Sequence, residues 1–533
     1  MEYTRIEPVT PCVFRPSNYA LRMNKRLIAF LSILFLSLSA PLIPVNAAVK
    51  AGAPCSKIGI TSVSSSKTYT CVKSGGKLKW STGVSTTTKS ARDIKATYST
   101  DGGYLDNIIG GPCAPDPLVP SEWQEMQSFA SDINGCAGQL RIAKYNLGNL
   151  RPTSTYQPAS GFSQVAPCKI SFQNARSGLS HGDQWRIQKR HPGPNSVIQL
   201  IPIYAEDTAK PKSTPSKDYS KFLDYMKDWI DYSTDFGSNV QLRIPNEYIK
   251  FPNKIEPYKL YHPVNWDTPG HVKFNKDVIS TVDPIIDFTG ANIGIVVAPP
   301  GTDASIMQQA ALGSFQTNEG LVAVAFSEFG DVPSNPRGSL YSGLTQPFWW
   351  IHESYHVGYG LDDHYGDSKS DISTEYGMGW WTMMTPFGGD LSVWEKWLLG
   401  FVQDSQIQCL PNNRSTITWM APSTVRTQES KAVVIPVSAT KVIVAESIRP
   451  AGLHYKVPQQ IEGVLVYEID LTKSDHGMGM KLSLPINRQV SNYPFFLGGA
   501  PLKKGDVTIS NGFRISVVES GTYGDVIKVE NSA

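Results

Sequence analysis

The sequence has few charged residues and no stretch suited to nucleic acid. Only 18% of its 533 residues are charged, and lysine plus arginine exceed aspartate plus glutamate by three. No basic block with interleaved aromatic residues occurs, and a nucleic-acid groove requires such a block. Hydrophobic residues make up 41%, which is ordinary for a globular protein and excludes general disorder. We therefore expect roughly two to four folded domains without a nucleic-acid partner.

Long apolar runs are also scarce. The clearest covers residues 27–40 directly after two basic residues, and it is shorter than the about 20 residues that a membrane-spanning helix needs. Small residues at positions 45–47 follow it, as at a signal-peptide cleavage site. We expect a signal peptide over residues 1–47, with Met23 as an alternative start and an uncleaved membrane anchor as the alternative to a signal peptide. A signal peptide predicts a secreted or cell-surface protein.

None of the seven cysteines forms a Cys-x-x-Cys pair, which excludes the usual thiolate zinc site. Cys12 lies in the part that a signal peptidase would remove. The even number that remains is typical of disulfides in an exported protein, and the candidates are Cys55, Cys71, Cys113, Cys136, Cys168 and Cys409. Close spacing favours a bridge between Cys55 and Cys71, and the sequence does not choose among the pairings of the other four.

The N-terminal third divides into two regions of different composition. Residues 48–95 form a small module with Cys55, Cys71 and Trp80, followed by a Ser/Thr/Lys linker. The module resembles short Cys/Trp modules near the N-termini of secreted proteins of high-GC Gram-positive bacteria, and we expect it to be a spacer or a wall-binding tag. Residues 96–190 carry little pattern beyond a helix at Ser121 to Ile133. We interpret them as a propeptide or as an N-terminal cover on the domain that follows.

Residues 191–405 show an α/β pattern, and residues 406–533 show a β pattern. Apolar residues recur at helical spacing from Tyr219 to Ile230, and a second helix with a proline kink is predicted over residues 276–288. The predicted strands are short apolar runs bounded by Gly, Pro, Ser and Asn. They cover residues 196–204, 239–244, 292–298, 321–326, 433–437, 441–449, 464–469, 513–518 and 526–529. The strands after residue 406 predict a C-terminal sandwich or jelly roll.

The most informative stretch is His352-Glu353-Ser354-Tyr355-His356, in a chain of only nine histidines. On a helix, side chains four residues apart project from the same face, so both imidazoles can reach one metal ion while Glu353 lies beside the open coordination position. Apolar residues 348–351 precede the motif, as expected for a helix inside a domain. Thr345 is the predicted N-cap. The motif is typical of zinc hydrolases.

A third protein ligand is expected nearby, because a catalytic zinc keeps three protein ligands and a water. Gly358 and Gly360 are predicted to end the helix and turn the chain back across the site. In zinc peptidases of the metzincin type the spacing is His-Glu-x-x-His-x-x-Gly-x-x-His/Asp. Counting from His356 selects Asp362, counting from Gly360 selects Asp363, and His364 is adjacent.

Two further interpretations involve more distant acids. The separation between His356 and Glu375 matches that of zinc aminopeptidases in which a glutamate on a second helix completes the site. The residues around Glu375 are loop-like, however, which weakens this alternative. Asp362, Asp367 and Asp371 are oxygen donors in a turn, and they offer an alternative as a loop that binds Ca²⁺.

Residues 379–385 and 391–401 carry a resemblance to a known family. Their sequences, Gly-Trp-Trp-Thr-Met-Met-Thr and Leu-Ser-Val-Trp-Glu-Lys-Trp-Leu-Leu-Gly-Phe, are similar to segments of the immune inhibitor A family of secreted bacterial zinc metallopeptidases. In that family the zinc motif is followed by Gly-Leu-Pro-Asp-x-Tyr. The resemblance covers roughly residues 195–470 and is tightest over residues 352–401.

The chain departs from the family's pattern at three places. One extra residue lies between His356 and Gly360, Asp362 stands where the family has proline, and Thr382 stands where it has aspartate. The extra residue leaves the third ligand open between neighbours. Matching the chain after Gly360 to the family's pattern favours Asp363.

Together, the sequence patterns and the resemblance predict an α+β chain with a metzincin-like zinc peptidase domain, a C-terminal all-β sandwich-like domain and a small N-terminal disulfide module. The resemblance also implies one Zn²⁺ bound by His352, His356 and Asp363, with Glu353 as the catalytic general base. Met384 would be the methionine-turn residue beneath the metal, and an ordinary core methionine is the alternative.

The implied function is that of a secreted zinc metalloendopeptidase. We expect a monomer that cleaves protein or peptide substrates and whose terminal domains contact cell wall or glycan. The alternative is a cell-surface or glycan-binding protein that keeps an inactive peptidase scaffold, since a large share of the chain lies outside the catalytic region.

Overall fold

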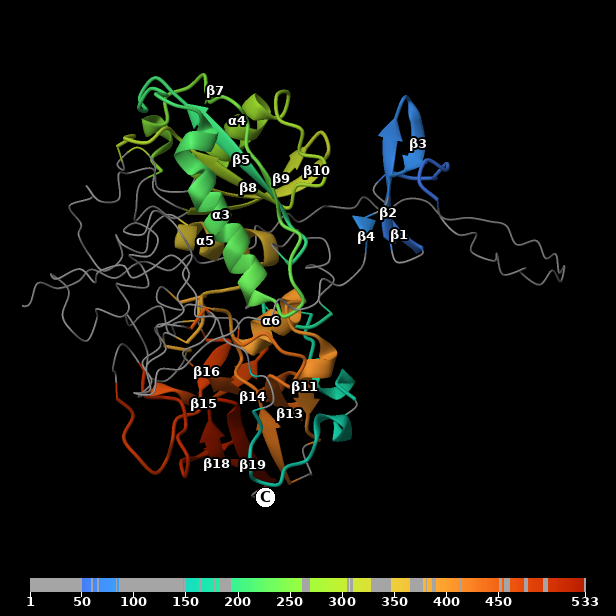
Figure 1. Ribbon diagram of the computed structural model, residues 1–533. Helices are drawn as coiled ribbons and strands as arrows, with labels where there is room; N and C mark the ends of the chain where they lie inside the picture. Colours follow the sequence, from blue (N-terminus) through green and yellow to red (C-terminus); the bar gives the residue numbers. More distant parts are fainter. Residues whose placement is uncertain are drawn as a thin grey trace, which may run out of the picture. The chain divides into compact units, whose positions relative to one another are not determined.

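The fold is taken from a computed structural model of the chain (Figure 1). It describes residues 50–58, 61–64, 67–82, 84–85, 147, 150–162, 164–173, 175, 178–182, 193–260, 269–303, 306, 310–326, 347–364, 377–379, 381–385, 390–411, 415–449, 453–454, 461–473, 478–491 and 497–531. The predicted signal peptide, the helix at 121–133, Cys113 and Cys136 lie outside these residues.

The chain forms two compact units, of which the smaller spans Val13–Thr88. Its described part is an antiparallel sheet of four strands: β1 (Thr61–Ser64), β2 (Lys67–Ser74), β3 (Lys77–Trp80) and β4 (Val84–Ser85). A disulfide joins Cys55 to Cys71, with 5.9 Å between their Cα atoms. This bridge confirms the pairing that spacing favoured, and it supplies the stability that a sheet with so small a core lacks.

The larger unit contains a mixed six-stranded sheet. Its strands are β5 (Val197–Tyr204), β6 (Gln241–Arg243), β7 (Ile249–Lys250), β8 (Ile293–Val297), β9 (Ala310–Thr317) and β10 (Gly320–Phe326). The order is β6-β5-β8-β10-β9, β7 also pairs with β5, and every pairing is parallel except that of β9 with β10. Buried strands such as β8 are apolar throughout because both of their faces are covered. β9 was not predicted.

Three long helices belong to this part of the chain: α3 (Pro215–Ser233), α4 (Pro269–Val282) and α5 (Pro347–Tyr359). The Thr214 hydroxyl accepts a hydrogen bond from the Lys217 amide and caps α3. The predicted helix with a proline kink over 276–288 was wrong, because α4 begins earlier and ends at Val282. Pro284 lacks an amide hydrogen and disfavours a helical residue before it, so the helix stops where a kink was expected.

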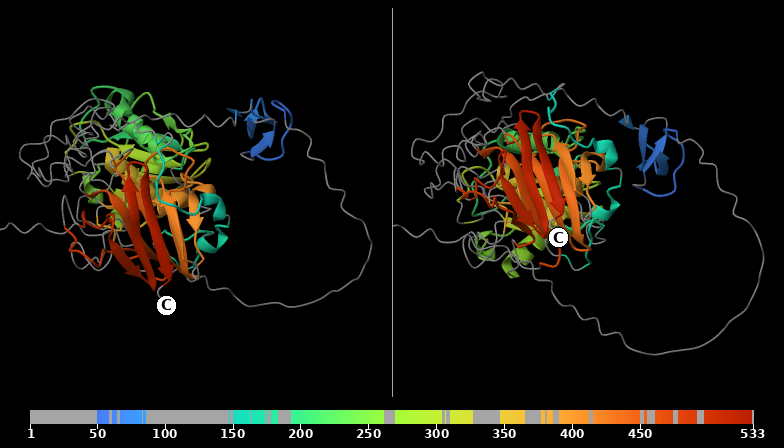
Figure 2. Two further views of the ribbon diagram at one scale, coloured as in Figure 1. Left: turned by 60° about the horizontal axis from the view of Figure 1, so that its bottom comes forward. Right: turned by 90° about the horizontal axis from the view of Figure 1, so that it is seen from below.

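The C-terminal part is rich in β-structure, as predicted. One sheet has the order β11-β13-β14-β15-β16, and the other has the order β12-β19-β18-β17. The strands are β11 (Ile407–Cys409), β12 (Thr416–Met420), β13 (Ala432–Ser438), β14 (Lys441–Ile448), β15 (Gly463–Asp470), β16 (Met480–Leu482), β17 (Val507–Ser510), β18 (Phe513–Gly521) and β19 (Gly524–Asn531). Figure 2 shows the two sheets against each other.

The five-stranded sheet separates two hydrophobic cores. Along β14, Ile443 and Ala445 face the four-stranded sheet, whereas Val442 and Val444 belong to the core that includes α5 and the six-stranded sheet. Strand geometry explains the split, because successive side chains point to opposite faces. The short helix α6 (Val393–Leu399) lies in the second core through Trp394. The boundary near residue 405 between a catalytic and a β domain therefore stays a prediction.

The described residues between 150 and 182 belong to the larger unit and are joined to its C-terminal strands. Cys168, in the 3₁₀ helix η4 (Ala166–Cys168), forms a disulfide with Cys409 of β11. The Gln157 amide donates to the Ile417 carbonyl of β12 at 2.8 Å. Both interpretations of residues 96–190, as a propeptide and as an N-terminal cover, stay predictions.

Shorter elements complete the fold, namely the 3₁₀ helices η3 (Ala159–Gly161), η5 (Glu256–Tyr258) and η7 (Asp404–Gln406). Within the ranges that the structure describes, no helix is long and apolar enough to cross a membrane.

Candidate metal centre

Helix α5 carries the histidine motif into the interior of the larger unit. It contacts β9, β10 and α3 (Figure 1), and the ring of Tyr355 lies 5.7 Å from that of Trp229 on α3. His352, Glu353 and His356 are all buried. These contacts with neighbouring elements hold the helix that presents the two imidazoles. The predicted cap, Thr345, lies outside the described residues.

Gly360 ends α5 and reverses the chain toward the motif. Its φ of 81° is in the left-handed region that favours glycine, and its amide donates to the carbonyls of Tyr355 and His356 at 3.0 Å each. The next carbonyl, that of Leu361, then lies 2.7 Å from Nδ1 of His356. This turn brings Asp363 to the two histidines, so the predicted glycine stop is confirmed at Gly360. The predicted stop at Gly358 is wrong, because Gly358 lies within α5.

Three side chains converge at one point. Oδ1 of Asp363 lies 3.1 Å from Nε2 of His352 and 3.3 Å from Nε2 of His356, and the two Nε2 atoms are 2.9 Å apart. All three residues are buried, and their ligand atoms lie within 4.8 Å of one another. Among the described residues, this is the group of His, Cys, Asp and Glu side chains with the spacing that a metal ion needs.

The hydrogen bonds at the far side of each imidazole fix which nitrogen faces this point. Nδ1 of His352 lies 3.0 Å from the Met383 carbonyl, and Nδ1 of His356 contacts the Leu361 carbonyl. A carbonyl only accepts, so Nδ1 carries the hydrogen and the neutral ring presents a lone pair at Nε2. Two lone pairs and a carboxylate oxygen then face one another in a buried space. That donor set fits a divalent metal such as zinc.

The charges around His356 favour a positive charge at this point. Burial by itself lowers the pKa of His356, but the Asp363 carboxylate, with smaller contributions from Glu353 and the Leu361 carbonyl, raises it to about 9. A proton on His356 and a metal ion therefore compete for the same position. Metal binding at this group is expected to release protons.

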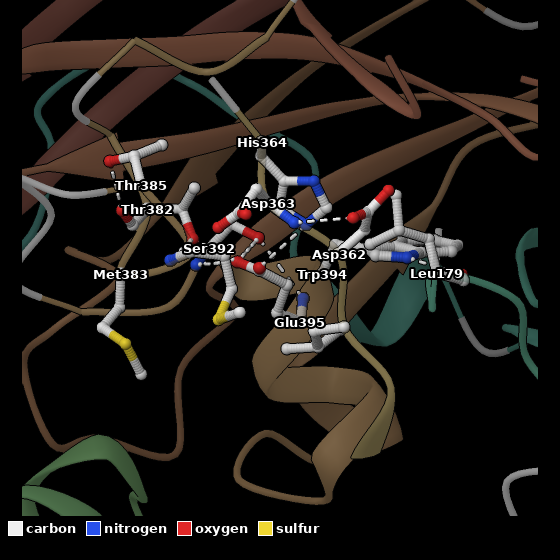
Figure 3. A network of polar contacts seen from close by, with 12 residues as sticks. Leu179, Asp362, Asp363, His364, Thr382, Met383, Thr385, Ser392, Trp394 and Glu395 are labelled. Atoms are coloured by element: carbon white, nitrogen blue, oxygen red, sulfur yellow. Dashed lines mark hydrogen bonds and ion pairs between the residues drawn. The ribbon is translucent and has the colours of Figure 1, made fainter. Parts of the chain in front are cut away.

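The two neighbours of Asp363 point elsewhere. A side-chain oxygen of Asp362 accepts a hydrogen bond from the Asp363 amide at 3.0 Å, and Asp362 therefore braces the loop. Nε2 of His364 lies 3.3 Å from Oε1 of Glu395, and both side chains are fully buried (Figure 3). The structure thus places Asp363, and neither of the other two candidates, against both histidines.

Residues 381–385 form the turn on the other side of the site. Met384 is fully buried, and its carbonyl accepts a hydrogen bond from the His364 amide at 2.9 Å. The neighbouring carbonyl of Met383 is the one that orients His352. Thr382, which replaces the aspartate of the family's pattern, donates through its hydroxyl to Glu395 at 2.7 Å. The role of Met384 as a floor beneath the metal stays a prediction.

Several proposed residues fall outside the described part of the chain. These are the alternative zinc ligand Glu375 and two acids of the suggested calcium loop, Asp367 and Asp371. Both alternatives stay predictions.

Sequence reasoning missed Glu395 and Gly178. Glu395 has a local signal, since Ser392-x-x-Glu395 is a capping box at the start of α6, but that pattern predicts a helix start and no role at a metal site. Gly178 has no local signal. A Cβ atom there would lie 2.2 Å from the Gly360 carbonyl oxygen, and this contact depends on the folded chain alone.

The distances, burial and hydrogen bonds of this group therefore carry the functional argument by themselves. The chain matches no protein-family model and no curated protein.

Proposed function

We propose that this chain is a secreted zinc-dependent endopeptidase. The observation that carries the proposal is the buried group of His352, His356 and Asp363, with Glu353 one residue from the first ligand on the same helix. Zn²⁺ bound there would lower the pKa of a bound water and polarise a carbonyl group of the substrate. Two imidazoles and one carboxylate are among the ligand sets that hold catalytic zinc in hydrolases.

The chain's own residues supply the remaining steps. Hydrogen bonds from Nδ1 of both histidines to backbone carbonyls hold each Nε2 toward the shared point. Glu353 accepts the proton of the attacking water and transfers it to the leaving amine, as a general base and then a general acid. Glu353 is buried, which limits the access of competing water to this carboxylate.

The resemblance of residues 352–401 to the immune inhibitor A family supports the same function. It also supports a metzincin-like assignment for the six-stranded sheet with α5, and a sandwich-like assignment for the two C-terminal sheets. Two disulfides, Cys55–Cys71 and Cys168–Cys409, fit an oxidising environment outside the cell.

Residues 50–85 support a second proposal, attachment to an anionic polymer of the cell surface. This segment contains six lysines but no arginine, aspartate or glutamate. Lys73, Lys77 and Lys79 are exposed on the adjacent strands β2 and β3. Lys50 and Lys57, which precede the strands, are also exposed. Positive charge without acidic neighbours attracts polyanions and is screened by salt. The full chain should bind an anionic resin at low salt, and Lys77→Glu with Lys79→Glu should weaken that binding; unchanged retention would contradict the attachment proposal.

The peptidase proposal is tested with purified protein and a mixed peptide library. We expect about one zinc per molecule, cleavage that a chelator abolishes, and recovery on adding zinc. Asp363→Ala should lose both zinc and cleavage, whereas its matched neighbour variant Asp362→Ala should keep most of both. Full cleavage without zinc would contradict the proposal. Glycan binding without any cleavage would favour the inactive-scaffold alternative.

A further inference from the structure

Glu395 lies where two segments of the metal centre meet the start of α6. The carboxylate is fully buried and divides its two oxygens between different partners. Oε2 accepts hydrogen bonds from the Thr382 hydroxyl at 2.7 Å and from the amide and hydroxyl of Ser392 at 2.8 and 2.7 Å. Oε1 faces Nε2 of His364 at 3.3 Å. Figure 3 shows Glu395 between these residues.

One branch of this network reaches the first zinc ligand. The Thr382 hydroxyl that donates to Glu395 also accepts from the Met384 amide at 3.2 Å. These bonds hold the turn in which the Met383 carbonyl lies 3.0 Å from Nδ1 of His352. Glu395 thereby fixes the acceptor that orients His352.

The other branch reaches the third ligand. His364 follows Asp363 directly in the chain. Its Nε2 lies 3.3 Å from Oε1 of Glu395, and its backbone amide donates to the Met384 carbonyl at 2.9 Å. The His364 carbonyl also accepts from the Met378 amide at 2.6 Å. Because Asp363 and His364 are consecutive, holding both the backbone and the side chain of His364 restricts the direction in which the Asp363 carboxylate projects.

We propose that Glu395 is a positioning residue. It holds both the turn of residues 381–385, whose Met383 carbonyl orients His352, and the loop that carries Asp363, so that His352 and Asp363 can bind the same metal ion. The inference rests on the proposed zinc site but concerns metal affinity, and it makes no use of peptide cleavage. Residues that orient metal ligands typically contribute about 10- to 100-fold to metal affinity.

Glu446 provides a matched control for the effect of removing a buried carboxylate. It is also buried and also contacts the start of α6, since its Oε1 accepts from the Val393 amide at 3.2 Å and from the Tyr467 hydroxyl at 3.0 Å. Val393 and Tyr467 belong to α6 and β15, and neither lies in the two segments that orient the ligands. A general loss of packing around α6 should therefore affect both glutamate variants alike.

The test measures zinc affinity by competition with a chelator, and the visible spectrum of the Co²⁺-substituted protein. We expect Glu395→Ala to weaken zinc binding by about 10- to 100-fold and to alter the Co²⁺ spectrum, while Glu446→Ala changes neither beyond about twofold. Thr382→Val and His364→Asn should each weaken zinc binding by a smaller factor. Neither should weaken it further in the Glu395→Ala background, because Glu395→Ala already removes the contacts through which Thr382 and His364 act.

Equal zinc affinity in folded Glu395→Ala and wild type would overturn the inference, as would equal losses in the two glutamate variants. If Glu395→Ala does not fold, Thr382→Val decides, because an unchanged affinity and Co²⁺ spectrum in that variant would also overturn it. A wild-type protein that binds no zinc would instead refute the proposed function, so the two failures are distinguishable.

Discussion

In each of the two histidines, His352 and His356, the two ring nitrogens have different roles. Nδ1 of each is held by a backbone carbonyl, from Met383 or Leu361, and Nε2 of each faces Asp363. The arrangement fixes the tautomer before a metal arrives. In the absence of metal, a proton on His356 balances the Asp363 carboxylate, which raises the pKa of His356 to about 9.

This raised pKa predicts a pH-dependent stability of the zinc-free protein. The folded-state pKa of His356, about 9, exceeds the ordinary value of 6.5, so the stabilisation is fully present below about pH 6.5 and is lost as pH rises through about 9. Urea unfolding of the chelated protein should show this decline, and His356→Gln should reduce it. The same pH slope in both proteins would contradict the assignment. Zinc binding should show the opposite trend and weaken toward acid pH.

A site residue could be predicted from the sequence only where a pattern of neighbouring residues identifies it. His352, Glu353 and His356 follow from helical spacing alone. Asp363 and Asp362 are adjacent, and only the turn at Gly360 determines which carboxylate faces the histidines. Glu395 lies on a different element, and its contacts to Thr382 and His364 form only on folding.

At the scale of elements, the segment that contains Gly178 packs against the start of the loop that carries Asp363, at Gly360 and Leu361. Gly178 has a φ of 77°, and a Cβ atom there would also lie 2.7 Å from Cα of Leu361. The next carbonyl along this segment, that of Leu179, accepts from Nε1 of Trp394 on α6 at 2.9 Å. The segment therefore links this loop to α6, and its backbone leaves no room for a side chain at the loop.

Gly178→Ala should consequently destabilise the fold and weaken zinc binding. Gly182→Ala is the matched control, because Gly182 lies in the same segment with a φ of 70° but a Cβ atom there would meet nothing within 4 Å. Both variants incur the strain of a left-handed residue, and only the first displaces the loop. We expect Gly178→Ala to cost about 1–3 kcal/mol more in free energy of unfolding. Equal effects on unfolding and on zinc titration would contradict this contact.

Secondary structure followed the sequence where periodicity was clear. α3 and β14 match the predicted periodic segments closely. β9 escaped prediction because it pairs only with β10, at the edge of the sheet, and its sequence of small residues lacks the apolar run of β8. α4 ends at Val282 because Pro284 terminates the helix, whereas the sequence pattern predicts a kink there and a helix that continues beyond it.

At the scale of the whole molecule, bonds between distant parts of the sequence close the larger unit. The Cys168–Cys409 disulfide spans a sequence separation of 241 residues, and Glu519 of β18 accepts from the Thr153 and Ser154 amides at 2.8 and 2.6 Å. Such partners have no local signature, which is why the role of residues 150–182 could not be predicted from their sequence.

Removing the long-range disulfide should destabilise the larger unit alone. We expect Cys168→Ala with Cys409→Ala to lower the free energy of unfolding by about 2–5 kcal/mol, since the bridge restricts a long loop of the unfolded chain. Cys55→Ala with Cys71→Ala is the control, because that bridge lies in the other compact unit. Urea unfolding monitored by tryptophan fluorescence measures both. An unchanged main transition in the first variant would contradict the account.

The central claim is that Glu353 performs proton transfer beside a zinc ion held by His352, His356 and Asp363. The most direct measurement compares zinc content and peptide cleavage in wild type and Glu353→Gln. We predict that the variant keeps about one zinc per molecule while kcat/KM falls by at least about 100-fold, the usual range for a general base. A variant that holds zinc and cleaves peptides as fast as wild type would contradict the claim.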